Sequence, residues 1–331
     1  MIVYDGIIES LQSMGGISIL FKEILLRSDS SKFYYFNYNS HSNLVTSPNL
    51  FKLKARYLER YRDFVYPVDE SDIFHSTYYR LPKKKCNVIT TVHDFTYEKF
   101  VKGLPRKVHS WQKKRAILNS DHIICVSSNT ANDLMKFCNV DEHKISVVYN
   151  GVSPDYYCLD SIQKENQVLF VGGRDGYKNF RYAVQAVAKC KNLSLGIVGS
   201  PLNVDEIEFL DNLLPNRYHG YGYLTNEMLN IEYNKSFALL YPSSYEGFGI
   251  PPLEAMKAGC PVIAINVSSI PEVVGDAGIL LDSIQVDEII EALQQVDNMR
   301  SDLTARGFIQ AAKFSWDKCY NETQNVYKKF F

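Results

Sequence analysis

Several features that would assign a protein to a special class are missing from this chain of 331 residues. No apolar run reaches the roughly 18 residues that a membrane-spanning helix needs. The first residues lack the basic segment and apolar stretch of a signal peptide. The seven cysteines are odd in number and include no Cys-x-x-Cys pair, which argues against a disulfide scaffold or a zinc site. We therefore expect a cytoplasmic protein, at most peripheral on the cytoplasmic face of a membrane.

Net charge is also nearly absent, with 36 basic against 37 acidic side chains, so we expect no nucleic-acid partner. The charge is unevenly divided. Residues 1–150 carry 21 basic and 15 acidic side chains, a net of +6, whereas residues 151–331 carry 15 and 22, a net of −7. The basic excess is concentrated in Lys83-Lys84-Lys85 and in the segment 102–115. Two interpretations stay open for the first half: an ordinary solvated surface, or contact with an anionic inner membrane surface.

Short apolar runs alternate with amphipathic segments along the chain, which is typical of parallel sheets layered with helices. The predicted strands are 33–37, 73–75, 87–91, 122–126, 145–148, 167–171, 193–198, 237–241, 261–264 and 278–281. The predicted helices are 16–27, 56–62, 105–118, 129–137, 179–190, 204–213 and 286–299. Because the length exceeds one core and a turn-forming cluster separates two such series at 150–154, we expect two α/β domains. The expected division is 1–155 and 156–313, with a closing helix in 314–331 that packs back on the first domain.

Two glutamates, Glu246 and Glu254, have seven residues between them and bracket a glycine loop that leads into a predicted helix. Glycine before a helix lets backbone amides approach a ligand, and the positive end of the helix dipole favours an anion. We expect the amides of Phe248, Gly249 and Ile250 to take this part. Carboxylates accept hydrogen bonds from hydroxyl groups. A phosphate seat between two hydroxyl acceptors describes a sugar nucleotide, although acidic residues near a helix start are common in any protein.

The whole string YPSSYEGFGIPPLEAMKAGCPVIA closely resembles the E-x7-E signature of retaining glycosyltransferase family 4. The resemblance implies the GT-B fold, in which two Rossmann-like, doubly wound α/β domains face an interdomain cleft. The first domain would bind the acceptor and the second the nucleotide sugar. The resemblance also implies that Glu254 holds the ribose hydroxyls and Glu246 a hydroxyl of the transferred sugar. The product would keep the donor's anomeric configuration through a front-face displacement.

The second half carries two further blocks of this family. VLFVGGRDGYKNF places Gly173 after a predicted strand, followed by Arg174 and Lys178, whose charges can neutralise a departing diphosphate. The chain contains no Asp-x-Asp, so we expect no metal and no cofactor besides the donor itself. HGYGYLTNEML resembles the block that contacts the nucleobase, with Tyr223 and Leu224 as candidate neighbours.

In the first half, SMGGISILFKEIL resembles the family's loop that faces the donor phosphates, here Gly15-Gly16. ITTVHDFTYEKF places His93 and Asp94 beyond a strand end and matches the motif whose histidine contacts the transferred sugar. Asp94 would orient His93 or accept a proton from the acceptor hydroxyl. A lone histidine is more often structural than catalytic, and we assign His75 to that group.

These blocks predict a retaining, metal-independent glycosyltransferase. It would move a hexose from a GDP-, UDP- or dTDP-linked donor to a hydroxyl of a glycan or lipid-linked glycan, as in polysaccharide, capsule or O-antigen assembly. Two alternatives stay open: an inverting GT-B transferase that uses Asp94 as the base, and a catalytically silent partner subunit that binds the nucleotide sugar.

Overall fold

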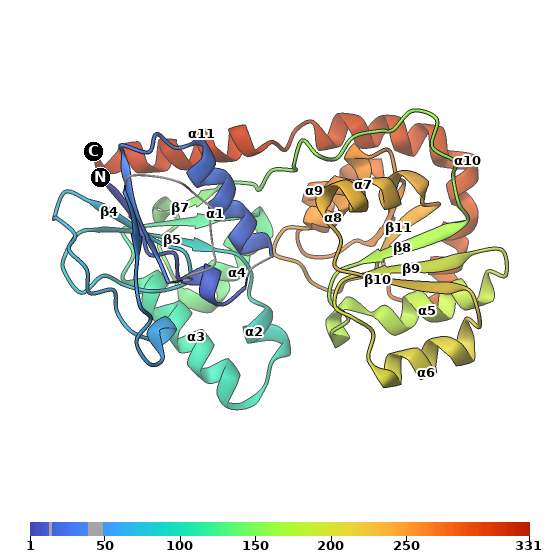
Figure 1. Ribbon diagram of the computed structural model, residues 1–331, viewed down its shortest axis with the longest axis horizontal. Helices are drawn as coiled ribbons and strands as arrows, with labels where there is room; N and C mark the ends of the chain where they lie inside the picture. Colours follow the sequence, from blue (N-terminus) through green and yellow to red (C-terminus); the bar gives the residue numbers. More distant parts are fainter. Residues whose placement is uncertain (13–14, 39–48) are drawn as a thin grey trace. The chain divides into compact units, whose positions relative to one another are not determined.

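The computed structural model describes residues 1–12, 15–38 and 49–331, which form two compact units (Figure 1). The first unit joins Met1–Gly151 to the C-terminal segment Trp316–Phe331, and the second is Val152–Ser315. The chain therefore leaves the first unit, builds the second, and returns for its last helix. The sequence places these boundaries a few residues away, at 155/156 and 313/314.

The first unit contains a seven-stranded sheet in which all neighbouring strands are parallel, in the order β3-β2-β1-β4-β5-β6-β7. Its strands are β1 (Ile2–Tyr4), β2 (Phe33–Asn37), β3 (Leu50–Lys52), β4 (Ile73–Ser76), β5 (Asn87–Val92), β6 (His122–Cys125) and β7 (Ile145–Val147). Its α-helices are α1 (Gly16–Arg27), α2 (Thr96–Phe100), α3 (Gly103–Leu118), α4 (Ser128–Cys138) and α11 (Trp316–Tyr327). Ser127 caps α4 by accepting a hydrogen bond from the Thr130 amide.

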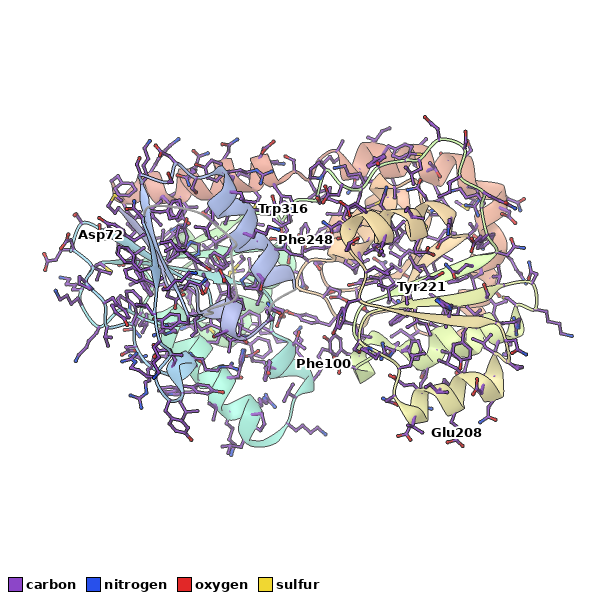
Figure 2. All side chains as sticks on the ribbon, in the orientation of Figure 1. Asp72, Phe100, Glu208, Tyr221, Phe248 and Trp316 are labelled. Atoms are coloured by element: carbon purple, nitrogen blue, oxygen red, sulfur yellow. The ribbon has the colours of Figure 1, made fainter. Side chains whose placement is uncertain are left out.

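The closing helix α11 belongs to the core of the first unit. It lies beside α1 (Figure 1), and Trp316, labelled at its start in Figure 2, is 3% exposed. A buried chain of hydrogen bonds fixes its far end. The Tyr327 hydroxyl lies 3.0 Å from the Tyr4 hydroxyl on β1 and 2.6 Å from Nδ1 of His75 on β4. His75 Nε2 lies 2.8 Å from the Thr91 hydroxyl on β5, so this histidine has the structural role expected of it.

The second unit contains a six-stranded parallel sheet in the order β10-β9-β8-β11-β12-β13. Its strands are β8 (Gln167–Val171), β9 (Ser194–Val198), β10 (Tyr218–Gly222), β11 (Ala238–Tyr241), β12 (Val262–Ile265) and β13 (Ile279–Leu281). Its α-helices are α5 (Phe180–Lys189), α6 (Val204–Leu213), α7 (Asn226–Lys235), α8 (Ile250–Lys257), α9 (Ile270–Val274) and α10 (Val286–Ala311). Figure 1 shows α5 and α6 on one face of this sheet and α7 and α8 on the other.

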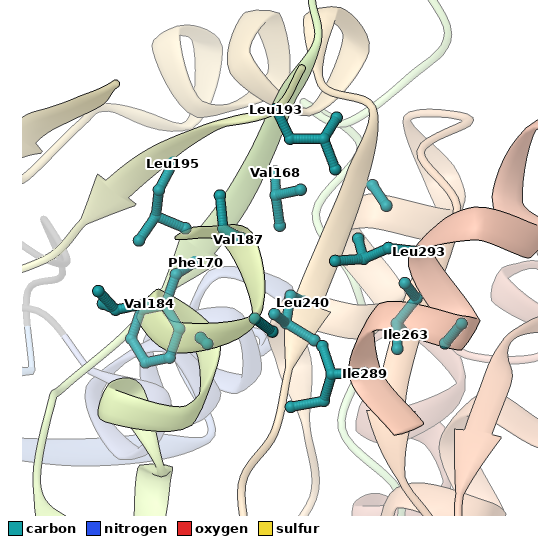
Figure 3. Packing of buried hydrophobic residues seen from close by; sticks show 14 of the residues in the cluster. Val168, Phe170, Val184, Val187, Leu193, Leu195, Leu240, Ile263, Ile289 and Leu293 are labelled. Carbon is teal, nitrogen blue, oxygen red and sulfur yellow. The ribbon is translucent and has the colours of Figure 1, made fainter. Parts of the chain in front are cut away.

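Fully buried aliphatic side chains hold the second unit together. Val168 and Leu240 project from adjacent strands toward Val184 and Val187 of α5 and Leu293 of α10 (Figure 3). Both strands are rich in β-branched and aliphatic residues, as parallel strands covered on both faces require. The core therefore anchors the strands whose carboxyl ends carry the predicted donor-binding loops.

Two helix predictions need correction. Residues 56–62 are not an α-helix; only Glu59–Tyr61 form a 3-10 turn. The Glu59 carboxylate instead accepts hydrogen bonds from the Arg56 side chain and, at 2.5 Å, from buried Arg80, and Leu58 takes a left-handed conformation (φ 56°). A tertiary ion pair thus overrides the local helical pattern.

Helix α10 runs to Ala311, well beyond the predicted end at residue 299. Gly307 lies within it and does not end it, because the missing side chain lets α10 pack closely on α8. A Cβ atom there would lie 3.3 Å from Met256 Cβ. Among the described residues, no helix combines the length and apolar character needed to cross a membrane.

Candidate active site

The loop from β11 into α8 holds the first of the two predicted glutamates. Gly249 precedes the helix with φ 107°, a conformation that favours glycine, and Pro251 and Pro252 occupy its first turn. No side chain caps this helix in the described structure. The helix start therefore keeps its partial positive charge for another partner, as the sequence predicts for an anion seat.

Lys178 and Glu246, two of the predicted catalytic residues, form an ion pair. Lys178 Nζ lies 2.5 Å from Glu246 Oε1, and both side chains are largely buried, at 14% and 13% exposed. Tyr241, at the end of β11, also hydrogen-bonds Glu246; burial and this carboxylate raise the pKa of Tyr241 well above its ordinary value. The carboxylate is thus held between one cation and one phenol.

Loops from three neighbouring strands meet at this pair. Lys178 follows β8, and Asn179 beside it donates through Nδ2 to the Pro242 carbonyl (2.8 Å) and to Ser244 Oγ (2.7 Å) in the loop after β11. Ser268 and Ser269 follow β12. Because β8, β11 and β12 are parallel neighbours, their carboxyl ends share one edge of the sheet, where ligands of open parallel sheets bind.

The two serines after β12 fix the backbone around Glu246. Ser268 Oγ accepts a hydrogen bond from the Glu246 amide (2.9 Å). The Ser269 hydroxyl donates to the carbonyls of Glu246 (3.0 Å) and Phe248 (2.7 Å). Sequence reasoning missed the contacts of Ser268, Ser269, Asn179 and Tyr241. The only signal for them was their position at the carboxyl end of a predicted strand or in the loop that follows it.

Glu254 lies on α8, and its side chain is buried. It is 9% exposed, and its Oε2 accepts a hydrogen bond from the Tyr233 hydroxyl at 3.0 Å. Burial raises the pKa of Glu254 to about 7, and hydrogen bonds from Tyr233 and Tyr156 hold it below the value that burial alone would give. Glu254 is therefore a partly protonated carboxyl at neutral pH, next to two phenols.

Arg174 contacts groups other than the Lys178–Glu246 pair. Its guanidinium forms two hydrogen bonds with Glu206 of α6, at 2.7 and 3.0 Å, and others with Ser200 Oγ and the Pro201 carbonyl. Its side chain is only 5% exposed. These contacts give Arg174 a structural role in joining the loops after β8 and β9, which the sequence alone did not indicate.

The glycines of the β8 loop lie at a close backbone approach. Gly172 has φ 128°, and its carbonyl oxygen would lie 2.6 Å from a Cβ atom at Gly199. Gly173, the predicted donor contact, follows directly. At the edge of the same sheet, Tyr223 after β10 is 71% exposed and Leu224 is half-buried. Thr225 caps α7 by accepting from the Met228 amide at 3.3 Å.

The first unit contains the remaining predicted residues. Gly15 is the residue before α1 and is extended, and a Cβ atom there would lie 2.4 Å from Gln12 Oε1; Gly16 begins the helix. The adjacent residues 13 and 14 lie outside the described part of the chain. Because Gln12 Oε1 is the end of a flexible side chain and extended backbone suits any residue, the structure does not require glycine at position 15.

His93 and Asp94 follow β5, as predicted. His93 is 8% exposed, and burial lowers its pKa to about 4 against the opposing charge of Asp94. Its buried Nε2 has no hydrogen-bond partner among the described residues. The Asp94 carboxylate accepts from the Thr96 amide at 2.9 Å. A neutral imidazole with one unsatisfied nitrogen is suited to a hydrogen bond with a sugar hydroxyl.

Across residues 1–12, 15–38 and 49–331, no three His, Cys, Asp or Glu side chains gather as a group that could hold a metal ion. The groups brought together are one lysine, one carboxylate, a helix start and a second, buried carboxyl. Such a set can bind an anion and accept hydrogen bonds from hydroxyl groups.

Comparison with known proteins gives matches along most of the chain. Residues 159–313 match the model "Glycosyl transferases group 1", and residues 24–156 match "Glycosyltransferase Family 4". O-antigen chain mannosyltransferase B of Escherichia coli is 31% identical over 299 residues, covering 82% of this chain and 76% of that protein.

Solved structures share the fold. Sucrose-phosphate synthase of Thermosynechococcus elongatus superposes with a TM-score of 0.79 at 18% identity, covering 100% of this chain and 98% of that one. HepE of Anabaena, solved in complex with UDP-glucose, gives a TM-score of 0.76 at 14% identity and covers 99% of both chains.

Proposed function

We propose that this chain, which belongs to the group 1 glycosyltransferase family and has its GT-B fold, transfers a hexose from a nucleotide diphosphate sugar. The transfer retains the anomeric configuration of the donor and needs no metal ion. The acceptor is a hydroxyl of a glycan or lipid-linked glycan in O-antigen or capsule-type assembly. The transferred sugar is mannose, in line with the mannosyltransferase named among the relatives. The nucleotide is GDP, UDP or dTDP.

The Lys178–Glu246 pair at the head of α8 carries this proposal. Cleavage of the bond between the sugar and the diphosphate leaves negative charge on the departing oxygen, which a fixed cation and helix-start amides stabilise. Lys178 supplies the cation, and the amides of Phe248, Gly249 and Ile250 supply the dipoles. Glu246, the partner of Lys178, accepts a hydrogen bond from a hydroxyl of the sugar. Phosphate and sugar are thereby bound by adjacent groups.

The other residues have supporting roles in this proposal. Glu254 accepts hydrogen bonds from the ribose hydroxyls, and Tyr223 and Leu224 contact the base. Gly15, Gly16 and Gly173 admit the phosphates closely, and His93 binds the transferred sugar through Nε2. Asp94 orients His93 or takes the acceptor's proton. The predicted contact of Arg174 with the diphosphate would require its contacts with Glu206 to open.

The proposal is tested with nucleotide sugars and substitutions of the pair. Thermal-shift screening with UDP, GDP and dTDP identifies the nucleotide, because a ligand that binds only the native state raises its melting temperature. Transfer is then measured for Lys178→Ala and Glu246→Gln. We expect each to lower kcat by roughly 100-fold to 1,000-fold, the usual effect of removing one stabilising group from a transition state.

Lys189 and Asp287 form a matched control in the same unit. They too are paired, at 3.1 Å, but their side chains are 59% and 83% exposed. Lys189→Ala and Asp287→Asn should leave transfer unchanged. Equal rates for both pairs would refute the assigned site.

Three further measurements separate the alternatives. The anomeric proton of the product, observed by NMR, distinguishes retention from inversion with Asp94 as the base. Full activity in excess chelator is expected for metal-independent transfer. Nucleotide binding without transfer or hydrolysis of any sugar nucleotide would favour a silent partner subunit.

A further inference from the structure

Helix α7 fastens the segment that opens the second unit, residues 153–159. Three asparagines of the helix, Asn226, Asn230 and Asn234, are four residues apart, so they lie along one of its faces. Their side-chain oxygens accept hydrogen bonds from the Tyr156 hydroxyl (3.2 Å), the Tyr157 amide (3.1 Å) and the Leu159 amide (2.7 Å), respectively. Asn230 and Asn234 are buried, where an amide without partners would be costly. The segment is therefore held to α7 at three points.

Helix α8 packs against α7 on the same face of the sheet and holds this segment at an earlier residue (Figure 1). Lys257 Nζ donates a hydrogen bond to the Ser153 carbonyl at 2.8 Å. Glu254 lies three residues before Lys257, so the two project from the same side of α8. The segment is thus fixed to both helices that surround the predicted ribose contact.

Two buried phenols meet at the Glu254 carboxyl, one from α7 and one from the fastened segment. Tyr233 Oη lies 3.0 Å from Glu254 Oε2, and Tyr156 is the second phenol partner of this carboxyl. The two rings pack edge to face, with centroids 5.9 Å apart. The Tyr156 hydroxyl has one proton and two acceptors, Asn226 Oδ1 and Glu254, and a charged acceptor forms the stronger hydrogen bond. An ionised Glu254 is therefore held by two donated hydrogen bonds.

The ionised carboxylate keeps acceptor capacity beyond these two contacts. A carboxylate accepts about four hydrogen bonds, roughly two at each oxygen. The phenols of Tyr156 and Tyr233 occupy two of these positions. The adjacent hydroxyls of a ribose supply two donors, which match the remaining positions in number.

We propose that Tyr156 and Tyr233 are positioning residues of the donor site, which hold the Glu254 carboxylate so that its remaining acceptor positions meet the ribose hydroxyls. Both phenols act through Glu254 and not on the sugar or the phosphates. The fastening of residues 153–159 keeps Tyr156 in place. The inference rests on the proposed function, in which Glu254 binds the ribose.

The phenols also act on the charge of Glu254. Burial raises its pKa to about 7, and the hydrogen bonds from Tyr233 and Tyr156 oppose this rise. Removing one phenol donor therefore raises the pKa further, so that more of Glu254 carries a proton at pH 7 and accepts fewer hydrogen bonds. The other ionisable groups close to Glu254 or its phenols are Tyr241 on β11, Asp155 beside Tyr156, Cys260 after α8, and Lys257. The Glu254→Gln background separates the titration of Glu254 from theirs.

Titration calorimetry of nucleotide binding tests this role. The probes are UDP, GDP and dTDP, each compared with its 2′,3′-dideoxy analogue, which has no ribose hydroxyl to donate. For the nucleotide that the parent chain binds, Tyr156→Phe and Tyr233→Phe should each weaken binding about fivefold at pH 7 and less than about twofold at pH 9. Binding of the dideoxy analogue should be equal in the parent and both variants. In the Glu254→Gln background, Tyr156→Phe should no longer change the pH profile.

Tyr218→Phe is the matched control. The Tyr218 hydroxyl also donates to a carboxylate, that of Asp211 at 2.7 Å. It lies at the start of β10, at the edge of the parallel sheet opposite to the donor loops. This substitution should leave the binding of every probe unchanged.

The parent chain alone gives a second measurement, which does not depend on the folding of any variant. Its preference for the nucleotide over the dideoxy analogue should rise about tenfold from pH 6 to pH 9, as Glu254 loses its proton. A preference independent of pH would overturn the inference. So would phenol variants that weaken both probes equally, and in either case the proposed function would stand. A parent chain that binds none of the three nucleotides would overturn the proposed function together with the inference.

Discussion

Glu254→Gln is expected to stabilise the fold at alkaline pH while weakening donor binding. Burial raises the pKa of Glu254 from 4.5 to about 7. Each pKa unit corresponds to about 1.4 kcal/mol, so ionising this carboxyl in the folded state costs about 3 kcal/mol. Glutamine has nearly the same shape, cannot ionise, and still offers an oxygen to Tyr233.

The sign of the pH dependence follows from proton binding. Between pH 4.5 and 7 the unfolded chain has lost the Glu254 proton and the folded chain retains it. The unfolded state then binds fewer protons, so this carboxyl makes stability fall as pH rises. Glu254→Gln should therefore match the parent chain near pH 4.5 and exceed it by up to about 3 kcal/mol at pH 8.

Urea unfolding followed by far-UV circular dichroism measures this difference. Fluorescence would not, because Trp111 and Trp316 both lie in the first unit whereas Glu254 lies in the second. Tyr233→Phe is the companion variant; it removes a hydrogen bond that lowers the pKa of Glu254, so its stability should fall more at pH 8 than at pH 5. A Glu254→Gln effect of the same size at both pH values would refute the reasoning.

Four further expectations come from substitutions at the described contacts. Gly249→Ala should lower the free energy of unfolding by about 1–2 kcal/mol and slow transfer, because φ is 107° and the new Cβ would lie 3.0 Å from Ile270 Cδ1. Unfolding and rate assays measure both effects, and Gly176→Ala, where an added Cβ meets no atom within 4 Å, is the control. Tyr327→Phe leaves His75 Nδ1 without its partner and should lower the unfolding free energy by about 1–3 kcal/mol. The pKa of His75 is lowered to about 3, so the unfolded state takes up its proton first and stability should fall from pH 6.5 downward. Burial also lowers the pKa of His93, His109 and His122 to about 4, so His75→Gln should make this fall shallower without abolishing it, and an unchanged slope would contradict the assignment. Arg174→Ala and Glu206→Gln should show a coupling of about 1–3 kcal/mol in a double-mutant cycle, and additive effects would contradict the pair.

Much of the fold follows from local sequence pattern. Strands β5 and β11 are apolar runs that the parallel sheet buries, and α1 and α6 begin and end where their periodic patterns do. The pattern missed β1, a buried strand of only three residues. It also missed the edge strands β3 and β10, whose residues are mostly exposed or half-buried and so form no apolar run. It failed again at residues 56–62, where pairing of Glu59 with Arg80 decides the backbone.

Some residues of the candidate site were likewise identified from the sequence, whereas others became apparent only from the folded structure. Glu246 and Lys178 were identified because they belong to sequence blocks, and the structure brings them together. Ser269 could not be identified, because its contact with Glu246 depends on β11 and β12, which become neighbours only in the folded sheet. Tyr241 could not be identified, because in sequence it is simply the last residue of an apolar strand. The pairing of Arg174 with Glu206 is likewise invisible in sequence, since Arg174 lies in the loop after β8 and Glu206 lies 32 residues later on α6.

The Lys178–Glu246 pair makes recognition of phosphate and of sugar interdependent in the proposed reaction. Without a donor, the two charges neutralise each other in a largely buried position. When a diphosphate attracts Lys178, the Glu246 carboxylate keeps only its contact with the Tyr241 phenol. A buried charge that loses its partner raises the free energy of the protein. A sugar hydroxyl that donates to Glu246 offsets this cost, and a nucleotide without the sugar does not. The same contact would therefore favour the complete donor over the released nucleotide, which helps product leave after transfer.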